Sequence, residues 1–304
     1  MELHDHGHEH EHEHKHERKK PLKLAIGLTA LIFVAEVIGG VISGSLSLLG
    51  DAAHMLQDVV ALLLSLGAMI MAERLPTPTK TFGYHRVEIA AAVVNGLLLL
   101  GVSGVIIWEA FARFANPVSI DSTTMLVVAV IGLAANIASA FFLHGSHDLN
   151  VRSAFFHVLG DTLSSVAVIA AAVWIALTGQ TFVDPLLGLV IAIVILVSSF
   201  SILNDAFRIL LQFVPKDVAV DDVIAAMESV PGVSGVHNVH LWSLCSNINV
   251  LDAHVYCCEA DPEIQETIKS EIRARLEKFR IGHSTLEFEC QECSDCRRFR
   301  ELRD

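Results

Sequence analysis

The chain has 304 residues, of which 53% are hydrophobic and 18% are charged, and its mean hydropathy is +0.53. Soluble globular proteins are less apolar than this, so the composition excludes an ordinary soluble protein and indicates several membrane-spanning segments. The formal net charge of −13 argues against nucleic acid as a partner, because nucleic-acid binding needs a basic face.

The first twenty residues are polar and carry seven histidines, one at every second position from His4 to His16. This segment lacks the apolar residues that a core needs, so we expect residues 1–20 to be disordered. Alternating His and Glu can hold zinc loosely, and the segment is therefore predicted to be a metal-collecting arm. The alternative is a solvated tail without a metal function.

Residues 21–212 are predicted to form a transport domain of six transmembrane helices. A helix needs about 20 apolar residues to cross the bilayer core. Stretches of this kind predict helices near residues 22–43, 48–72, 86–112, 120–144, 152–178 and 184–206. Basic residues gather before the first helix and in the gaps after the second, fourth and sixth helices, which places both termini in the cytoplasm.

Beyond Pro215 the sequence has the hydropathy of a soluble domain. Two segments have helical spacing and three alternate like strands, in the order Val220–Val230, Val236–Leu244, Asn249–Tyr256, Glu263–Phe279 and Ser284–Glu289. The predicted fold class is therefore an α-helical membrane protein with six transmembrane helices, plus a small cytoplasmic α+β (αββαβ) C-terminal domain at residues 213–290. We expect two helices on one face of a three-stranded sheet. Residues 291–304 are predicted to be a polar tail that contains cysteines.

Ionisable residues inside a membrane helix cost roughly 2.5–3.5 kcal/mol each and so need a reason to be there. In the second predicted helix, His54 and Asp58 are four residues apart and therefore share one face; His157 and Asp161 repeat this spacing in the fifth helix. Two imidazoles and two carboxylates form a ligand set that suits Zn2+, which predicts a transport site. Each pair could instead be structural, but the repeated spacing favours metal. Asp51 is interpreted as the cap of the second helix.

Histidine and cysteine gather in the C-terminal domain and tail. The histidines are His237, His240, His254 and His283, and they are followed by Cys290, Cys293 and Cys296 in the pattern C-x-x-C-x-x-C. Imidazole and thiolate bind borderline or soft metals, so we predict a regulatory metal site here. The alternatives are histidines that serve folding and dimer packing, and cysteines that are redox-active or inert. Cys245, Cys257 and Cys258 are predicted to be interior.

Several motifs make the chain resemble the cation diffusion facilitator family, in its zinc-transporting branch. They are SGSLSLLGDAAHMLQD, TFGYHRVEIAAAVVNG, SAFFHVLGDTLSSVAV, VHNVHLWSL and HSTLEFE. The resemblance implies a homodimer in a lipid bilayer that exchanges divalent metal for protons by alternating access. Zn2+ would be the transported substrate and a regulatory ligand, with no organic cofactor. The histidine run is similar to that of bacterial cobalt, zinc and cadmium resistance exporters, which implies the bacterial inner membrane.

Carried over residue by residue, the resemblance implies that the transport site is His54, Asp58, His157 and Asp161. It also implies a tail-domain site that includes His237, His254 and His283, with Cys290 standing where some relatives have a carboxylate. His85 matches a position that binds metal in some members of the family.

Two other functions compete with transport. An intramembrane zinc hydrolase usually keeps three protein ligands and one water, whereas four ligands are available here and no H-E-x-x-H motif occurs, so we expect no enzyme. A metal sensor would use the helices only as an anchor. The polar residues Gln57, Asn95 and Asn136 inside apolar helices fit a metal pathway better than an anchor.

Overall fold

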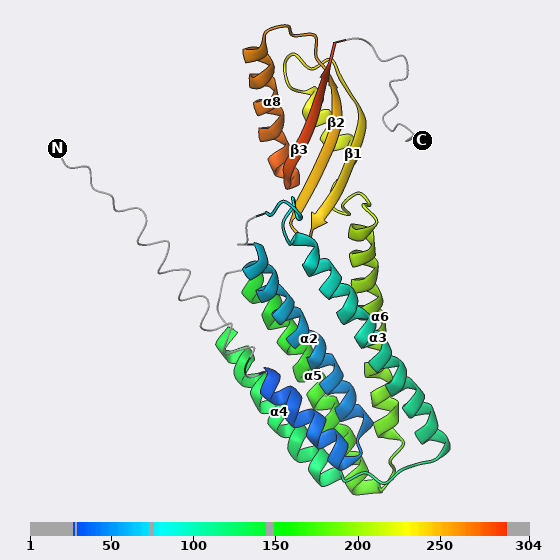
Figure 1. Cartoon of the computed structure of the whole chain (residues 1–304). Helices are drawn as coiled ribbons and strands as arrows, with labels where there is room; N and C mark the ends of the chain where they lie inside the picture. The colour runs from blue at the N-terminus through cyan, green and yellow to red at the C-terminus, as the bar shows by residue number, and fades with distance from the viewer. Residues whose placement is uncertain (1–26, 28, 73–75, 144–148, 291–304) are drawn as a thin grey trace, which may run out of the picture. The chain divides into compact units, whose positions relative to one another are not determined.

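The structure, a computed structural model, describes residues 27, 29–72, 76–143 and 149–290 (Figure 1). The predicted arm of residues 1–20 and the predicted tail of residues 291–304 lie outside the described residues. The chain divides into two compact units, Met1–Leu66 with Val94–Ser201 and Gly67–Val93 with Ile202–Asp304. The described part of the first unit is helical, and the second contains a sheet.

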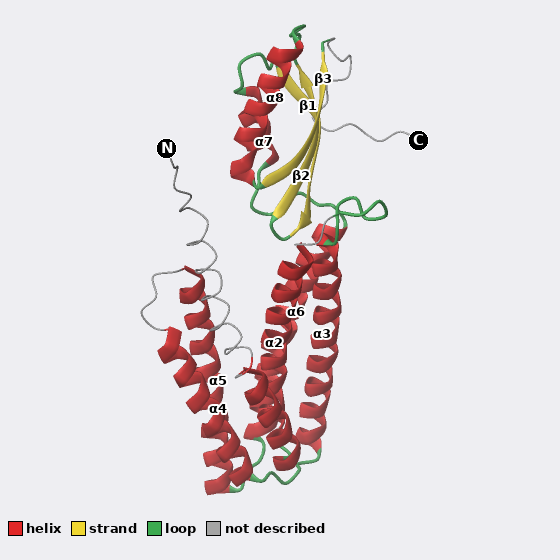
Figure 2. Cartoon of the chain, turned by 60° about the vertical axis from the view of Figure 1, so that its left-hand side comes forward, coloured by secondary structure: helices red, strands yellow, loops and turns green. Residues whose placement is uncertain are grey.

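The C-terminal domain has the predicted αββαβ order. Its elements are α7 (Val220–Glu228), β1 (Gly235–Cys245), β2 (Ile248–Tyr256), α8 (Pro262–Leu276), the short 3-10 helix η1 (Glu277–Phe279) and β3 (Ile281–Glu289). The strand order is β1-β2-β3; β1 pairs antiparallel with β2, and β2 pairs parallel with β3. Both α7 and α8 lie on one face of the sheet (Figure 2), which confirms the predicted layer arrangement.

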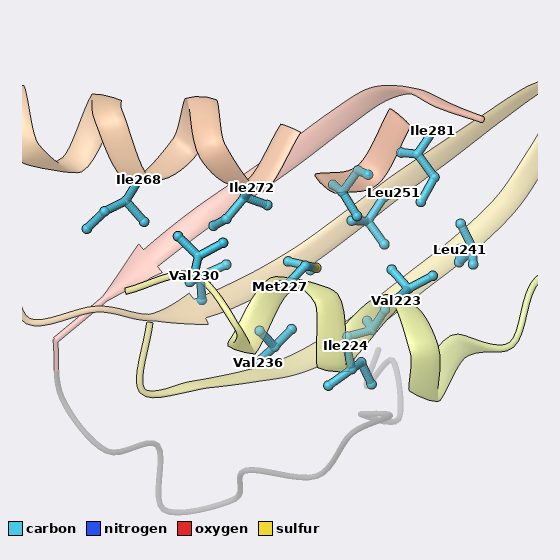
Figure 3. Close-up of a cluster of buried hydrophobic side chains, with 14 of the residues drawn as sticks. Val223, Ile224, Met227, Val230, Val236, Leu241, Leu251, Ile268, Ile272 and Ile281 are labelled. Carbon is cyan, nitrogen blue, oxygen red and sulfur yellow. The ribbon is translucent and has the colours of Figure 1, made fainter. Parts of the chain in front are cut away.

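A single apolar core holds this domain together. Asp261 caps α8 with its side chain, and Ile268, Ile272 and Leu276, each four residues from the next, bury one face of that helix. Figure 3 shows this face of α8 against the helix α7 and the sheet; the labelled neighbours include Val223, Met227 and Leu251. The helical spacing of α8 and the alternation of β2 therefore point their apolar residues into the same layer.

Six helices follow one another in the described chain between residues 29 and 210. They are Thr29–Ser43, α2 (Leu46–Ala72), α3 (His85–Ala115), α4 (Ser122–Leu143), α5 (Leu149–Thr178) and α6 (Val183–Leu210). Among the described residues, four helical segments are long and apolar enough to cross a membrane: His85–Ala115, Ser122–Ser139, Leu159–Thr178 and Val183–Leu210. Large apolar side chains such as Trp108, Phe141 and Leu177 are exposed, as expected where lipid replaces water. The prediction of an α-helical membrane protein is confirmed.

The helix α2 joins the two cores of the helical unit. Leu46 and Ala53 pack against α3 and α6, whereas Leu48 packs against α4 and α5. At Gly188 of α6, an added Cβ atom would lie 3.2 Å from the backbone carbonyl carbon of Leu46. This glycine therefore allows α6 to approach the start of α2 closely.

Asp184, at the start of α6, holds the start of α2. Its carboxylate is fully buried and accepts hydrogen bonds from the backbone N–H groups of Leu46, at 2.7 Å, and Ser47, at 3.0 Å. The Ser45 hydroxyl donates to the same carboxylate at 2.6 Å, and Arg113 of α3 lies 3.7 Å away as its ion-pair partner. The first N–H groups of a helix have no partner within that helix. Asp184 supplies one, and it also joins the ends of three helices.

We expect Asp184→Asn to destabilise the protein by about 3 kcal/mol, because an amide replaces the charged acceptor and Arg113 loses one of its two carboxylate partners. The matched control is Asp121→Asn. Asp121 is exposed and accepts hydrogen bonds from the backbone N–H groups of Thr123 and Thr124 at the start of α4. Asparagine caps helices about as well as aspartate, so this change should leave the unfolding temperature nearly unchanged. The measurement is the unfolding temperature of each protein in detergent. Equal shifts for the two variants would contradict the role given to Asp184.

Candidate metal sites

His54 of α2 and Asp161 of α5 meet inside the helical unit. The His54 Nε2 atom lies 3.5 Å from the Asp161 Oδ1 atom, and the side chains are 26% and 14% exposed. One turn nearer to the start of α2, Asp51 accepts a hydrogen bond of 2.6 Å from the Ser164 hydroxyl of α5. A step of three residues forward along α2 is therefore matched by a step of three residues back along α5. This is the register of two antiparallel helices in contact.

Asp58 and His157 would continue this register by one more turn. Both belong to described helices, but their side chains lie outside the described residues. Asp58 is four residues after His54, and His157 is four residues before Asp161, so the backbone register places the two positions at the same level. The four-residue transport site stays a prediction, and the structure describes one of its pairs.

The prediction that Asp51 caps α2 is wrong. The helix begins at Leu46, and the cap is Ser45, whose hydroxyl accepts a hydrogen bond of 3.1 Å from the backbone N–H of Leu48. Asp51 lies in the second turn, where it is buried and bonded to α5. The nearby residues Ser45, Ser47 and Gly50 correctly indicated that a helix begins here. They did not indicate which residue would be the cap.

Glu36 is a further carboxylate that the sequence analysis did not assign. It lies in the helix Thr29–Ser43, is 1% exposed, and its Oε2 atom has no hydrogen-bond partner among the described residues. Glu36 lies close enough to Asp51 and Asp161 to interact electrostatically with both carboxylates. An acidic residue in an apolar helix indicates a possible functional role. However, no spacing motif in the sequence linked Glu36 to His54.

In the C-terminal domain, each of the three strands contributes one residue to a cluster. The His237 Nε2 atom lies 3.2 Å from the Glu289 Oε2 atom, and the His254 Nδ1 atom lies 2.6 Å from the Glu289 Oε1 atom. One ligand atom from each of the three residues lies within 4.8 Å of the others. Two imidazoles and a carboxylate are donors that Zn2+ accepts, and three protein ligands leave a fourth position open. The cluster therefore fits a metal ion.

A β-bulge lets Asn238 reach the cluster. The register of β1 against β2 shifts between His237 and His240, and Asn238 has a φ of 49°, in the left-handed region that Asn tolerates. The Asn238 Nδ2 atom lies 3.0 Å from His254 Nε2, and the Oδ1 atom lies 3.2 Å from His240 Nε2. With the amide donating to Nε2, the ring proton of His254 is assigned to Nδ1, which donates to Glu289. The predicted ligand His240 is linked to the cluster through Asn238.

The structure does not bring His283 to this cluster within one chain. His283 pairs with Val250, whereas the residue of β3 opposite His254 is Glu287. The four residues between these levels correspond to about 13 Å along a strand. The ring of His283 instead packs edge-on against Phe82, with 5.6 Å between ring centroids. Glu289, which the sequence analysis missed, lies where a further ligand was expected.

Cys290 directly follows Glu289 and lies beside Cys258. The Cys258 thiol donates a hydrogen bond of 2.9 Å to the Cys290 carbonyl oxygen, and hydrogen bonding with the same thiol raises the pKa of Cys290. Cys245 and Cys257 are buried, as predicted, but Cys258 is exposed. The prediction that Cys258 is interior was wrong because Cys257 takes the inward position after the end of β2, and the next side chain points outward.

The other predicted ligands are more isolated. His85 is the first residue of α3, and its Nδ1 atom lies 4.0 Å from the Cys245 sulfur. Among the described residues, only the cluster of His237, His254 and Glu289 combines three possible ligands. Cys293 and Cys296 lie outside the described residues.

We expect Zn2+ binding by the fragment 213–290 to need His237 and Glu289 but not His283. At a Zn2+ concentration of about 100 times Kd, binding should stabilise the fold by about 2.7 kcal/mol. His237→Ala and Glu289→Gln should remove most of this gain, whereas the matched control His283→Ala, on the same strand, should keep it. The measurement is the melting temperature with and without Zn2+ under reducing conditions. An equal loss in His283→Ala would show that the cluster lacks its proposed ligand set.

The comparisons with known families cover almost all of the described chain. Residues 22–211 match the cation efflux transmembrane domain, and residues 215–289 match the cytoplasmic domain of cation efflux proteins. The boundary between the two matches falls after α6, where the predicted transport domain ends.

Similar proteins are known from several bacteria. The metal cation efflux system protein CzcD of Cupriavidus metallidurans is 41% identical over 278 residues, which are 90% of this chain and 87% of the relative. The cadmium, cobalt and zinc/H(+)-K(+) antiporter of Bacillus subtilis is 38% identical over 85% of each chain. The zinc transporter ZitB of Escherichia coli is 38% identical over 96% of this chain and 95% of the relative. Together with the helical unit and the αββαβ domain, these matches show that the chain belongs to the cation efflux family of membrane proteins.

Proposed function

We propose that this protein exports divalent metal cations, above all Zn2+, from the cytoplasm in exchange for protons. The observation that carries the proposal is the contact between His54 and Asp161, in two membrane helices that each contain the spacing His-x-x-x-Asp. The printed names of the relatives, a zinc transporter and an antiporter for cadmium, cobalt and zinc, support a transported metal. Cd2+ and Co2+ are therefore further candidate substrates.

The ligand chemistry accounts for the exchange. On this proposal His54, Asp58, His157 and Asp161 surround the transported ion. Neutral imidazole binds Zn2+ and imidazolium does not, so protons and Zn2+ compete for the same atoms. When the site faces the cytoplasm, Zn2+ displaces protons from it. When it faces a more acidic outer side, protonation expels Zn2+, and the protonated carrier returns.

Polar groups in the surrounding helices support an ion pathway rather than a simple anchor. Gln57 of α2 donates a hydrogen bond of 2.9 Å to Ser198 of α6. Its Oε1 atom and the Oδ1 atom of the buried Asn95 have no hydrogen-bond partner among the described residues. Buried polar atoms without partners are costly in a membrane, but water or a hydrated ion that enters the bundle would satisfy them.

The remaining parts have regulatory or supporting roles on this proposal. The protein is a homodimer in the bacterial inner membrane, with both termini in the cytoplasm and dimer contacts in the C-terminal domain. The match to the cytoplasmic domain of cation efflux proteins supports this placement. His237, His254 and Glu289 hold a regulatory Zn2+ ion, and the histidines of residues 4–16 collect metal.

The proposed transport activity has two rivals, an intramembrane zinc hydrolase and a metal sensor. The names of the relatives describe efflux, transport and antiport, which favours a carrier. A hydrolase would cleave a bond without net movement of metal, and a sensor would bind metal without transport. Metal flux in proteoliposomes therefore separates all three functions.

We expect Asp161→Ala to abolish Zn2+ flux in proteoliposomes while leaving the protein folded. Changing residues that only support a ligand costs about 10–100-fold in metal affinity, so losing a ligand should reduce flux by about a hundredfold or more. Stability should fall little, because a costly carboxylate leaves the membrane interior.

The matched control is Asp121→Ala, which removes an exposed carboxylate at the start of α4 and should retain wild-type flux. Gel filtration and the unfolding temperature report on folding. Wild-type flux from a well-folded Asp161→Ala protein would refute the transport site.

A second prediction concerns metal selectivity. His54→Asp leaves one imidazole and three carboxylates in the proposed site. Oxygen ligands suit harder ions such as Mn2+, whereas imidazole favours Zn2+. We therefore expect flux of Mn2+ relative to Zn2+ to rise in this variant when single ions are compared in matched vesicles. An unchanged ion ranking would place His54 outside the ligand shell.

A further inference from the structure

A cavity of about 150 Å3 lies where the chain passes from α6 into the C-terminal domain. One wall is the end of α6 with the segment that follows it, and the other is the end of β1 with the turn after it; both walls belong to the second compact unit. Sites for drug-sized ligands measure about 300–1,000 Å3, so this cavity suits a smaller polar group. Its polar lining residues are Asp205, Arg208, Lys216, Asp217, Ser243 and Ser246.

The length of α6 places this cavity in the headgroup layer of the membrane. The helix has 28 residues and is therefore about 42 Å long, which equals the thickness of a bilayer with its headgroup layers. Around the end of α6, the side chains of Phe207, Leu211 and Phe213 are 45%, 64% and 49% exposed. Apolar and aromatic side chains in this position are typical of a membrane interface. They give lipid acyl chains a surface beside the cavity.

The charges that line the cavity are balanced. Two side chains are basic, Arg208 and Lys216, and two are acidic, Asp205 and Asp217. Lys216 pairs with Asp205, and both side chains are more than half exposed, so water screens this pair and it contributes little to stability. A ligand with one negative and one positive group complements this lining better than a ligand of a single charge.

The guanidinium of Arg208 is fixed in place beside the cavity. One of its Nη atoms donates a hydrogen bond of 3.2 Å to the Val214 carbonyl oxygen, and its Cζ atom lies 5.2 Å from the centre of the Phe213 ring. A guanidinium has five N–H donors in a planar fork that matches phosphate oxygens. Arg208 is therefore suited to hold a phosphate at the membrane surface.

We propose that this cavity binds the headgroup of a zwitterionic phospholipid with a primary ammonium group, phosphatidylethanolamine. Arg208 and Lys216 hold its phosphate, and the carboxylates of Asp205 and Asp217 accept hydrogen bonds from its ammonium group. The proposal goes beyond the proposed transport function and does not depend on it. Because the bound headgroup would contact both α6 and the end of β1, it would also link the C-terminal domain to the membrane.

The test measures lipid affinity by native mass spectrometry of the full-length protein in a mild detergent. The probes are phosphatidylethanolamine, phosphatidylcholine and phosphatidylglycerol with identical acyl chains. We expect the first molecule of phosphatidylethanolamine to bind about tenfold more tightly than either of the other lipids. Choline has no N–H group to donate to the carboxylates, and phosphatidylglycerol has no cation to pair with them.

Variants locate the binding in the cavity. Arg208→Gln and Asp205→Asn should each weaken the binding of phosphatidylethanolamine by about tenfold, because each removes one charged partner of the headgroup. Asp205→Asn should leave the weaker binding of phosphatidylcholine unchanged, a difference that general misfolding would not produce. The matched control is Arg273→Gln, on α8, where the arginine is exposed and pairs with Glu266; this variant should bind all three lipids like the unmutated protein.

Three results would overturn the proposal. The first is equal affinity of the unmutated protein for the three lipids, and the second is full affinity for phosphatidylethanolamine in both Arg208→Gln and Asp205→Asn. The third is displacement of the bound lipid by inorganic phosphate, which would show that the cavity takes a free anion instead of a lipid headgroup.

Discussion

The buried carboxylate of Asp184 is the interaction on which the helical unit depends. It accepts hydrogen bonds from the first backbone N–H groups of α2, which have no partner within their own helix and would be costly to leave unpaired in apolar surroundings. Because a helix rises 1.5 Å per residue, fixing Leu46 also fixes His54, about 12 Å further along α2. Arg113 extends the same contact to α3. The buried carboxylate of Asp184 thus fixes the level along the helix axis at which the proposed metal ligand His54 lies.

The contact between α2 and α5 shows how ionisable side chains are tolerated inside the bundle. Asp51 contacts Ser164 and His54 contacts Asp161, so both of these polar groups of α2 meet a polar group on the facing helix α5. Pairing of this kind lowers the cost of burying charge, but it doesn't remove it. Glu36 adds a further buried acidic side chain to the helical unit, beyond the two acidic residues that take part in the contact between α2 and α5. On the proposed transport function, a divalent cation held by the acidic residues of this region would give their presence in membrane helices a physical reason.

Much of the fold could be predicted because its signals are local. Long stretches without charge marked the membrane helices, and alternation marked β1 and β2. The contact of His54 with Asp161 followed from a repeated spacing on two helices. The residue of β3 that contacts His237 and His254 was harder to predict from the sequence, because it depends on which end of β3 lies beside these two histidines. A helix connects β2 to β3, as is typical of parallel pairing, and the parallel pairing places Glu289 there instead of His283. Asp184 and Cys258 had no local pattern, because their partners lie far away in sequence.

The central claim is that one site exchanges divalent metal for protons. The most direct measurement records Zn2+ and pH together inside sealed proteoliposomes, with one dye for each and no membrane potential. On addition of external Zn2+, the account predicts that Zn2+ enters while the lumen becomes more alkaline, at a fixed ratio of protons to Zn2+. It also predicts that an imposed acidic lumen accelerates entry. Zn2+ entry without any movement of protons, or binding of Zn2+ without entry, would contradict it.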